Sequence, residues 1–248
     1  MSAVTDLQDQ KQRAAAAAME YVASGMRLGL GTGSTAAAFI NALGAEVSSG
    51  LDVVCVATSA ATEAQARDLG IKLSTLDDLQ YLDLAVDGAD EIDSELRLIK
   101  GGGGALLREK IVAAASDRMV VIADSTKLVD RIGTFPLPIE VVRFGIHATR
   151  NMIQSLATEA GCEGQITLRR GADEKPFVTE NGNLILDCKF QGIPQPEFLA
   201  ELFQLVPGVV EHGMFLGLTE VALIAEADGE ITKLEVDDDD EDDGAVSV

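Results

Sequence analysis

Long hydrophobic runs are missing from this sequence of 248 residues, although 47% of its residues are hydrophobic. No stretch approaches the roughly 18 consecutive apolar residues that cross a membrane, and the N-terminus lacks the basic and then apolar pattern of a signal peptide. We therefore expect a globular protein with an ample core, located in the cytoplasm and not inserted into a membrane.

Tryptophan is absent, and histidine and cysteine are scarce. The two histidines, His147 and His212, are too few and too scattered for a metal site, and we expect neither to be catalytic. The three cysteines, Cys55, Cys162 and Cys188, are odd in number and mostly lie in apolar runs. We expect them to be reduced thiols in the core rather than a disulfide framework.

Positive charge is also in short supply, since 19 lysines and arginines face 41 acids and give a formal net charge of −22. Seven of the acids form the run Asp237–Asp243. Without this run the chain still has a net charge of −15. Such a field repels phosphates and anionic lipids, so we expect no nucleic-acid or membrane partner. Acid spread over the whole chain is typical of adaptation to molar salt, where counterions screen the repulsion. We favour a halophilic source over an ordinary acidic protein with an acidic tail.

Short apolar strands alternate with helices through the first half of the sequence. The expected strands are 26–30, 51–57, 82–86 and 119–123, and the expected helices are 7–24, one ending near Leu43, 62–69 and 105–116. This alternation predicts an α/β fold with a Rossmann-like, doubly wound, mainly parallel sheet. Ligands of such sheets bind at the carboxyl ends of the strands.

The pattern changes near Phe135-Pro136-Leu137-Pro138. The next expected elements are strand 139–142, helix 147–160, strands 165–168 and 184–188, helix 196–205, and strands 221–225 and 231–236 that return to the first sheet. We expect a catalytic domain of residues 1–133 and 205–236, an inserted small α+β domain of residues 134–204, and an acidic tail over residues 237–248. The tail should be disordered, because its charges repel and it has nothing apolar to bury.

A glycine-rich turn, Gly29-Leu30-Gly31-Thr32-Gly33-Ser34-Thr35, joins the first strand to a helix. Its small residues let an anion approach the backbone, and the helix N-terminus offers free N–H groups. The spacing also fits a loose dinucleotide fingerprint or a plain tight turn. However, the second strand ends in Val56-Ala57-Thr58-Ser59, without the acid that a dinucleotide site uses to bind ribose. We favour a phosphate monoester over NAD.

Four acids lie within the seven residues Asp87-Gly88-Ala89-Asp90-Glu91-Ile92-Asp93, directly after the third strand. Acids in this place suit acid–base chemistry, Mg²⁺ binding or a solvated turn. A further strand ends in Ala123-Asp124-Ser125-Thr126-Lys127, which brings one of only eight lysines to the same edge of the sheet. Lys127 is either a surface lysine or the group that neutralises a phosphate.

The segment Lys100-Gly101-Gly102-Gly103-Gly104-Ala105-Leu106-Leu107-Arg108-Glu109-Lys110 contains four consecutive glycines. Each costs about 0.5–1 kcal/mol relative to alanine in regular structure, so a run of them makes sense where backbone N–H groups converge on a ligand. A flexible linker is the alternative. Glu109 falls about one turn into the next helix, where it either complements the helix dipole or moves protons beside Lys100.

Together these loops resemble ribose-5-phosphate isomerase A. The matching segments are G-T-G-S-T (31–35), A-T-S-x-x-T (57–62), D-G-A-D-E (87–91), K-G-G-G-G-A-L-x-R-E-K (100–110), D-x-x-K (124–127) and P-G-V-V-E-H-G-M-F (207–215). They occur in the order of the family and span nearly the whole chain up to about Val236. The acidic C-terminal extension is the one departure.

The resemblance implies an enzyme that interconverts D-ribose 5-phosphate and D-ribulose 5-phosphate through an enediol(ate), in the non-oxidative pentose phosphate pathway. It implies that Glu109 is the general base and that Asp87, Asp90 and Lys100 assist ring opening and stabilise charge. The remaining implied substrate-binding residues are Thr32, Gly33, Ser34, Thr35, Gly88, Ala89, Gly101, Gly102, Gly103 and Lys127, joined by Lys11 from the first helix. It also implies an inserted ferredoxin-like domain, a homodimer or homotetramer, and no metal or organic cofactor.

Three other functions stay open at this point. A non-catalytic sugar-phosphate sensor would normally carry a basic DNA-binding region, and this sequence has none. Another enzyme of the wider superfamily, such as an amino-sugar phosphate deaminase-isomerase or a CoA transferase, fits poorly with the complete segment 100–110. An NAD-dependent dehydrogenase would be excluded by absence of cofactor binding.

Overall fold

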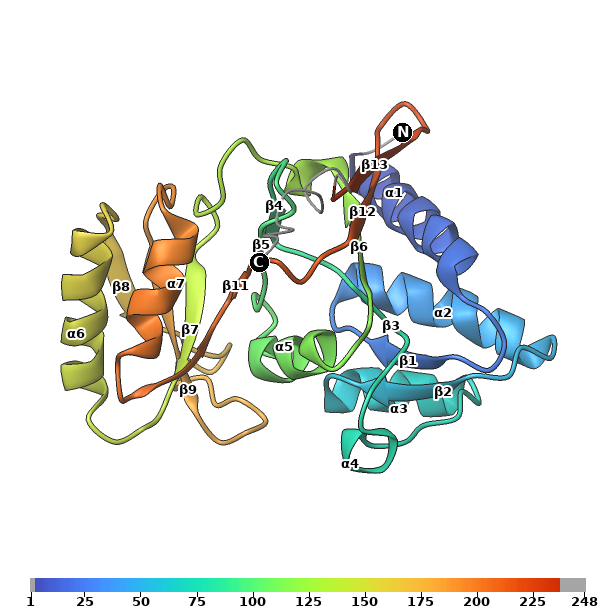
Figure 1. Cartoon of the computed structure of the whole chain (residues 1–248), viewed down its shortest axis with the longest axis horizontal. Helices are drawn as coiled ribbons and strands as arrows, with labels where there is room; N and C mark the ends of the chain where they lie inside the picture. Colours follow the sequence, from blue (N-terminus) through green and yellow to red (C-terminus); the bar gives the residue numbers. More distant parts are fainter. Residues whose placement is uncertain (1–2, 237–248) are drawn as a thin grey trace, which may run out of the picture.

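A computed structural model describes residues 3–236, and the acidic tail expected over residues 237–248 lies outside the described residues. The elements form two lobes that lie side by side (Figure 1). The larger lobe contains a six-stranded sheet, the smaller lobe contains a four-stranded sheet, and a third sheet of three short strands completes the fold. Within residues 3–236, none of the helices is both long and apolar enough to span a membrane.

The six-stranded sheet has the order β13-β12-β6-β3-β1-β2, in which only β13 is antiparallel to its neighbour. Its strands are β1 (Arg27–Leu30), β2 (Val54–Ala57), β3 (Leu84–Asp87), β6 (Met119–Asp124), β12 (Val221–Ala225) and β13 (Ile231–Glu235). β2 and β3, the next two strands of this sheet along the chain, lie on opposite sides of β1. The carboxyl ends of β1 and β3 therefore lie at the switch point, where open α/β sheets bind ligands.

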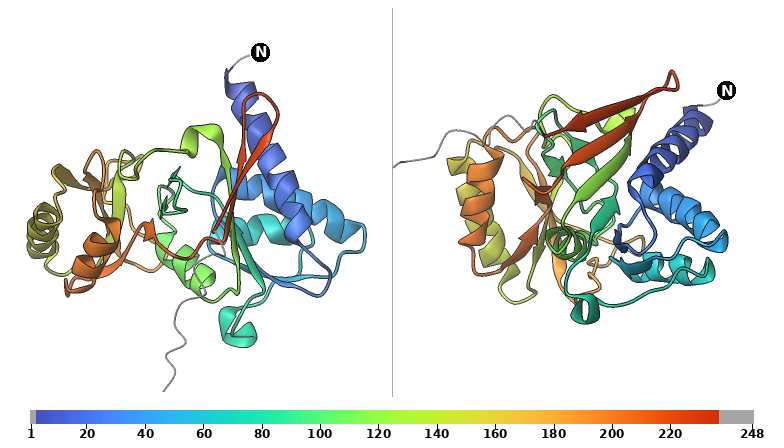
Figure 2. Two further views of the ribbon diagram at one scale, coloured as in Figure 1. Left: turned by 45° about the horizontal axis from the view of Figure 1, so that its top comes forward. Right: turned by 45° about the vertical axis from the view of Figure 1, so that its right-hand side comes forward.

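Helices cover both faces of this sheet (Figure 2). On one face lie α1 (Ala3–Ala18), the 3-10 helix η1 (Met19–Tyr21) and α2 (Ser34–Ser48), and their apolar side chains share a core with Leu28, Leu30 and Val86 of the strands. α5 (Leu106–Ala114) packs on the opposite face. Gly29 lets α5 approach, because a Cβ there would lie 2.4 Å from Val112 Cγ1. The short helices α3 (Ala60–Asp68) and α4 (Leu76–Leu79) follow β2.

The smaller lobe has the βαββαβ order of a ferredoxin-like fold. It comprises β7 (Leu137–Val141), α6 (Ile146–Glu159), β8 (Gln165–Leu168), β9 (Leu184–Lys189), α7 (Pro196–Gln204) and β10 (Val209–His212), with the antiparallel strand order β10-β7-β9-β8. Alternate residues of β7, such as Ile139 and Val141, pack with Phe203 in one apolar core. The segment 134–204 supplies three of the four strands, and β10 follows it along the chain.

The third sheet was not expected from the sequence. It consists of β4 (Glu91–Ile92), β5 (Leu98–Ile99) and β11 (Met214–Phe215), all antiparallel. Strands of two residues show no periodicity, so the pattern of the sequence does not reveal them. This sheet places Lys100 directly after β5, where its N–H donates to Gly213 O at 2.8 Å. The strand before the four glycines therefore belongs to this small sheet, not to the central one.

Most of the other expected elements are present with shifted ends, and the return of strands 221–225 and 231–236 to the first sheet is confirmed. The first helix ends at Ala18 and not at Ser24, because its last turn tightens into η1. α2 continues past Leu43 to Ser48. Gly44 does not break it, since this glycine packs against Leu69, which a Cβ would approach to 2.9 Å. The three cysteines are buried and unpaired, as expected.

Candidate active site

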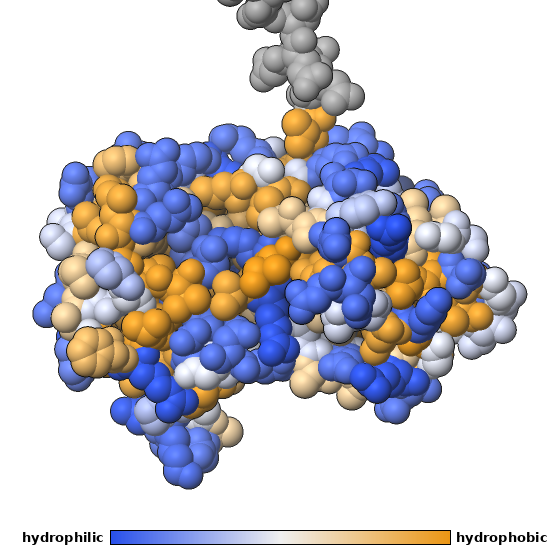
Figure 3. All heavy atoms as spheres, turned by 60° about the horizontal axis from the view of Figure 1, so that its bottom comes forward, coloured by the Kyte–Doolittle hydropathy of each residue, from blue (hydrophilic) through white to orange (hydrophobic). Residues whose placement is uncertain are grey.

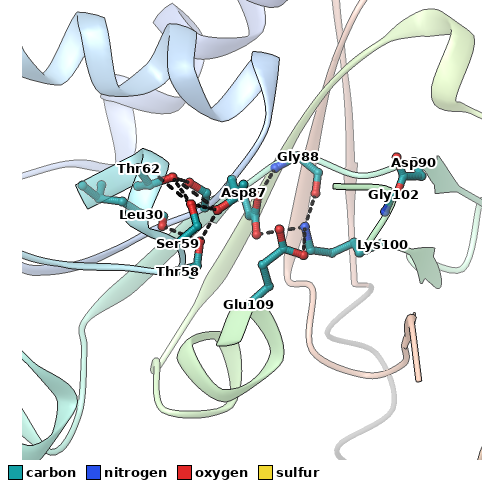
Figure 4. A network of polar contacts seen from close by, with 12 residues as sticks. Leu30, Thr58, Ser59, Thr62, Asp87, Gly88, Asp90, Lys100, Gly102 and Glu109 are labelled. Atoms are coloured by element: carbon teal, nitrogen blue, oxygen red, sulfur yellow. Dashed lines mark hydrogen bonds and ion pairs between the residues drawn. The ribbon is translucent and has the colours of Figure 1, made fainter. Parts of the chain in front are cut away.

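A buried ionic cluster lies beside the carboxyl end of β3. Lys100 Nζ is 2.8 Å from Asp87 Oδ2 and 3.3 Å from Glu109 Oε2. All three side chains are at most 5% exposed. Asp87 is the last residue of β3, Lys100 follows β5, and Glu109 projects from the first turn of α5 (Figure 4). Three elements that are distant in the sequence thus bring two carboxylates to one ammonium group.

The protonation of Glu109 is strongly shifted by this environment. Burial raises the pKa of Glu109 from its ordinary 4.5 to about 8, although the nearby charge of Lys100 opposes the shift. Burial alone lowers the pKa of Lys100, but the charges of Asp87 and Glu109 outweigh this and raise it, so Lys100 stays charged. Oε2 of Glu109 accepts no hydrogen bond from the described residues. A carboxylate that titrates near neutrality is suited to move protons.

Asp87 is held as the anion partner of Lys100. Its Oδ1 accepts hydrogen bonds from Gly88 N at 2.7 Å and from Thr32 N at 3.1 Å. Burial raises its pKa, while Lys100 and these backbone donors favour the charged form. Gly31 is required here, because a Cβ at this position would lie 2.0 Å from Asp87 Oδ1. The glycine-rich turn therefore fits around this carboxylate as well as facing the pocket.

The same turn ends in a cluster of hydroxyl groups. Thr32 Oγ1 lies 2.7 Å from Thr58 Oγ1, 2.8 Å from Ser59 Oγ and 3.2 Å from Thr62 Oγ1. Thr62 also donates to Gly31 O at 2.8 Å. These bonds join the ends of β1 and β2 and fix the turn. Thr58, Ser59 and Thr62 were matched in the sequence only as a family segment, and their hydroxyl-rich spacing after a strand was the available signal.

The four-glycine loop crosses the opposite side of the cluster. Gly102 N donates to Asp90 Oδ2 at 2.7 Å. Gly101 and Gly104 have φ values of +99° and +87°, which L side chains rarely adopt. A Cβ at Gly102 would lie 2.7 Å from Asp90 Oδ1. The loop is therefore an ordered structure with a defined backbone course, and a flexible linker is the wrong description of it.

The four acids of the segment 87–93 have separate partners. Asp87 binds Lys100, Asp90 binds Gly102 N, Glu91 accepts from the amides of Gly133 and Phe135, and Asp93 pairs with Arg97 at 2.7 Å. Among residues 3–236, no three acids, histidines or cysteines are grouped as a metal site. Each of the four carboxylates thus has a defined partner in the fold, so a merely solvated turn is the wrong description of this segment.

Basic and hydroxyl groups gather at the other end of the pocket. α2 begins after Gly33, which provides no side-chain cap, so the first N–H groups of the helix are left for a ligand. Lys11 of α1 reaches over and donates from Nζ to Ser34 Oγ at 3.0 Å. Lys127 lies in the 3-10 helix η2 (Ser125–Lys127) after β6. This end of the pocket has the donors and charge that a phosphate requires.

These groups line one cavity of about 140 Å³. Its walls contain Lys11, Thr32, Gly33, Ser34, Thr35, Gly88, Ala89, Asp90, Lys100, Gly101, Gly102, Gly103, Glu109 and Lys127. Every candidate residue from the sequence is among them except Asp87, whose carboxylate pairs with Lys100 of the cavity wall. The pocket thus has a basic end at α2 and a buried acid–base pair at α5.

Comparison with known proteins decides the family. The model of ribose 5-phosphate isomerase A (phosphoriboisomerase A) matches residues 54–229. The chain belongs to this family. A ribose-5-phosphate isomerase A of Rhodopseudomonas palustris is 55% identical over 90% of this chain and 97% of its own. Another, of Nitrobacter hamburgensis, is 60% identical over 88% of this chain and 94% of its own.

Solved structures of the family share the fold. Ribose 5-phosphate isomerase from Plasmodium falciparum superimposes with a TM-score of 0.87 at 38% identity, covering 93% of this chain and 99% of its own. A D-ribose-5-phosphate isomerase in complex with phospho-erythronic acid gives 0.85 at 36% identity, covering 93% and 99%. The expected Rossmann-like sheet with an inserted α+β unit is confirmed. So is the expected class of enzyme, an isomerase that interconverts ribose 5-phosphate and ribulose 5-phosphate.

Proposed function

We propose that the pocket between α2 and α5 is where this chain interconverts D-ribose 5-phosphate and D-ribulose 5-phosphate, with Glu109 as the base. The observation that carries this assignment is the buried Glu109 carboxylate, whose pKa is raised to about 8 and which faces the cavity beside Lys100. The open-chain sugar is a phosphate monoester with a carbonyl at the other end. Its two ends match the basic and the acid–base ends of the pocket.

Glu109 moves one proton between adjacent carbons in this mechanism. Its carboxylate removes the proton from C2 of the aldose, the electron pair forms the C1–C2 double bond, and the carbonyl oxygen O1 becomes an oxyanion. The proton on O2 passes to O1, and Glu109 returns its proton to C1, which leaves the carbonyl at C2. Each step is reversible, so the same groups serve both directions, and no metal or organic cofactor is called for.

Lys100 stabilises the negative charge of the enediolate. Its ammonium group is preorganised by Asp87 and by Gly88 O, which accepts from Nζ at 2.6 Å. A charge that is already fixed in place costs little reorganisation when the oxyanion forms. Asp90 also lines the cavity and holds Gly102 N, so it is placed to take part in ring opening. Gly88, Ala89, Gly101 and Gly103 complete this side of the substrate site.

The phosphate binds at the N-terminus of α2. Gly33, Ser34 and Thr35 offer backbone N–H groups, and Ser34 and Thr35 also offer hydroxyls. Thr32 lines the same end of the pocket, and Lys127 and Lys11 supply positive charge. These residues hold the end of the substrate that does not react. Binding energy gained there fixes the reacting carbons against Glu109.

The test is turnover of ribose 5-phosphate by the wild type and by Glu109→Gln, without added metal. We expect turnover by the variant to fall by a factor of at least about 10³, because it loses both the general base and the charge of the carboxylate. The variant should still bind the substrate. The matched control is Glu63→Gln on α3, a half-exposed glutamate that pairs with Arg67. A wild type that does not convert the sugar phosphate would contradict the assignment.

We also propose that the protein is adapted to high salt. The support is the net charge of −22, only seven units of which lie in the run 237–243. Hydrophilic side chains are spread over both lobes on the face drawn in Figure 3. Activity and melting temperature should both rise from dilute buffer to molar KCl, because counterions screen the repulsion. Maximal activity in dilute buffer would contradict a halophilic source.

The remaining proposals concern organisation and setting. We propose two domains as expected from the sequence, with one change to the boundary. The smaller domain extends beyond the expected residues 134–204 to include β10 (Val209–His212), which pairs with β7, and the larger domain comprises residues 1–133 and the chain after β10. We propose a homodimer or homotetramer as the assembly. We propose a cytoplasmic location, which the three unpaired and buried cysteines fit. Light scattering of the purified protein measures the assembly directly, and a monomer at working concentration would contradict it.

A further inference from the structure

The smaller lobe contacts the four-glycine loop through an arginine that the motifs do not include. Arg169 directly follows β8, and its Nη1 donates to Gly101 O at 2.8 Å and to Gly102 O at 3.1 Å. Its Nε and Nη2 donate to Asp187 Oδ2 at 2.9 Å and Oδ1 at 2.5 Å. Asp187 lies on β9, so the guanidinium is fixed by the smaller lobe and extends to the catalytic loop.

The ion pair that holds Arg169 is mostly buried, whereas its bond to Gly102 O lies at the surface. The side chain of Arg169 is 13% exposed and that of Asp187 is 18% exposed. The ring of Phe177, 6.0 Å from the guanidinium, packs on Gly104, where a Cβ would lie 2.5 Å from Phe177 Cζ. A planar, bidentate and partly desolvated ion pair is strong and directional. The smaller lobe therefore holds two carbonyls of the loop in one geometry.

The planarity of the peptide group turns this contact into a constraint on the pocket. In a trans peptide the C=O and the following N–H point in opposite directions. With the carbonyls of Gly101 and Gly102 on Arg169, the N–H groups of Gly102 and Gly103 are directed to the other side of the loop. Gly102 N–H is found there, bonded to Asp90 Oδ2 in the cavity wall. The same rule directs Gly103 N–H toward the cavity.

We propose that Arg169, held by Asp187, is a positioning residue for the reaction. It fixes the Gly101–Gly102 and Gly102–Gly103 peptides so that Gly103 N–H donates to the oxygen of the sugar that becomes negative in the enediolate. Glycine has wide conformational freedom, so without this contact the loop samples other backbone geometries. Preorganised donors act mainly on the transition state, so their loss lowers kcat more than it raises KM. The role proposed for Arg169 rests on the isomerase reaction proposed above.

The experiment compares Arg169→Met and Arg169→Lys with Arg170→Met and the wild type. Arg170 is the matched control, because its side chain is exposed and donates from Nη1 to Glu174 O, away from the glycine loop. We expect Arg169→Met to lower kcat by about 10- to 100-fold, as for a misplaced catalytic group, with a smaller change in KM. Arg169→Lys keeps the charge near Asp187 but lacks the planar fork, so it should recover part of kcat. Arg170→Met should match the wild type.

Hydrogen exchange of the peptide that contains Gly101–Gly104 supplies a second readout. It should become faster in Arg169→Met, while exchange in the central strands stays unchanged. If Arg169→Met does not fold, Arg169→Lys carries the test. This variant should have the same melting temperature as the wild type and a kcat that is about threefold to tenfold lower. Wild-type kcat in either folded variant would overturn the role of Arg169. An inactive wild type would instead contradict the isomerase function itself.

Discussion

The raised pKa of Glu109 makes the pH dependence of the free enzyme a specific test of the base. With a pKa of about 8, about one molecule in ten carries the required carboxylate at pH 7, and about nine in ten carry it at pH 9. Since kcat/KM reports the ionisations of the free enzyme, it should rise about tenfold between these two values. The phosphate of the substrate titrates near pH 6, so it is already about nine-tenths doubly ionised at pH 7 and adds only about a tenth to the change up to pH 9.

The assay is the initial rate of ketose formation at low ribose 5-phosphate, from pH 6 to 9.5, at constant ionic strength. Circular dichroism at each pH shows that the protein stays folded. Constant ionic strength matters because this chain has a net charge of −22 and responds to screening. A kcat/KM that is flat above pH 6 would refute the reasoning, since it would mean that Glu109 ionises near its ordinary value in spite of its burial.

Three further outcomes follow from the site. Lys100→Met should lower kcat by at least about 100-fold, which is comparable to the loss of one oxyanion donor, because the pocket loses the ammonium group that faces both carboxylates. An unchanged kcat would exclude Lys100 from stabilising the charge of the enediolate. Lys127→Ala should raise KM for the phosphorylated sugar more than it lowers kcat, measured by steady-state kinetics, and an unaltered KM would remove it from the phosphate site. The pKa of Glu109 is higher in the folded than in the unfolded state, so the stability that Glu109 contributes is complete below pH 4.5 and is lost as the pH rises through about 8. Chemical denaturation should therefore show the free energy of unfolding of Glu109→Gln rising relative to that of the wild type across this pH window, by up to a few kcal/mol. A difference between the two proteins that stays constant with pH would count against the raised pKa.

The sequence predicted the elements that bury regular apolar patterns. The parallel strands around Leu28, Val86 and Ile122 appear as expected, because short apolar runs bounded by glycines or polar residues have few other structures. Strands 165–168 and 221–225 match residue for residue. The two-residue strands β4, β5 and β11 were missed, since their pairing is set by tertiary contacts and not by periodicity. The end of α2 was placed too early, because Gly44 looks like a helix terminator until Leu69 is seen to pack on it.

For the site, the sequence indicated the loops but not the contacts inside them. It placed Glu109 and Lys100 near each other, yet the 3.3 Å distance and the burial that raises the pKa of Glu109 require the fold. The ion pair that joins Asp87 to Lys100 at 2.8 Å likewise requires the fold, and the place of Asp87 in the substrate site stays a prediction. Thr58 and Thr62 were matched only as part of the family segment 57–62, and their bonds to Thr32 require the fold. Arg169 contacts the glycine loop from the smaller lobe, and no local pattern in the sequence ties it to the site.

The most direct test of the central claim is isomerisation in deuterium oxide, followed by analysis of the product. If Glu109 carries the proton between C2 and C1 through an enediolate, part of the ribulose 5-phosphate formed by the wild type should contain deuterium at C1, because the carboxyl proton exchanges with solvent. Glu109→Gln should form neither product nor deuterated sugar. Wild-type product entirely free of deuterium, or normal turnover by Glu109→Gln, would contradict proton transfer by Glu109.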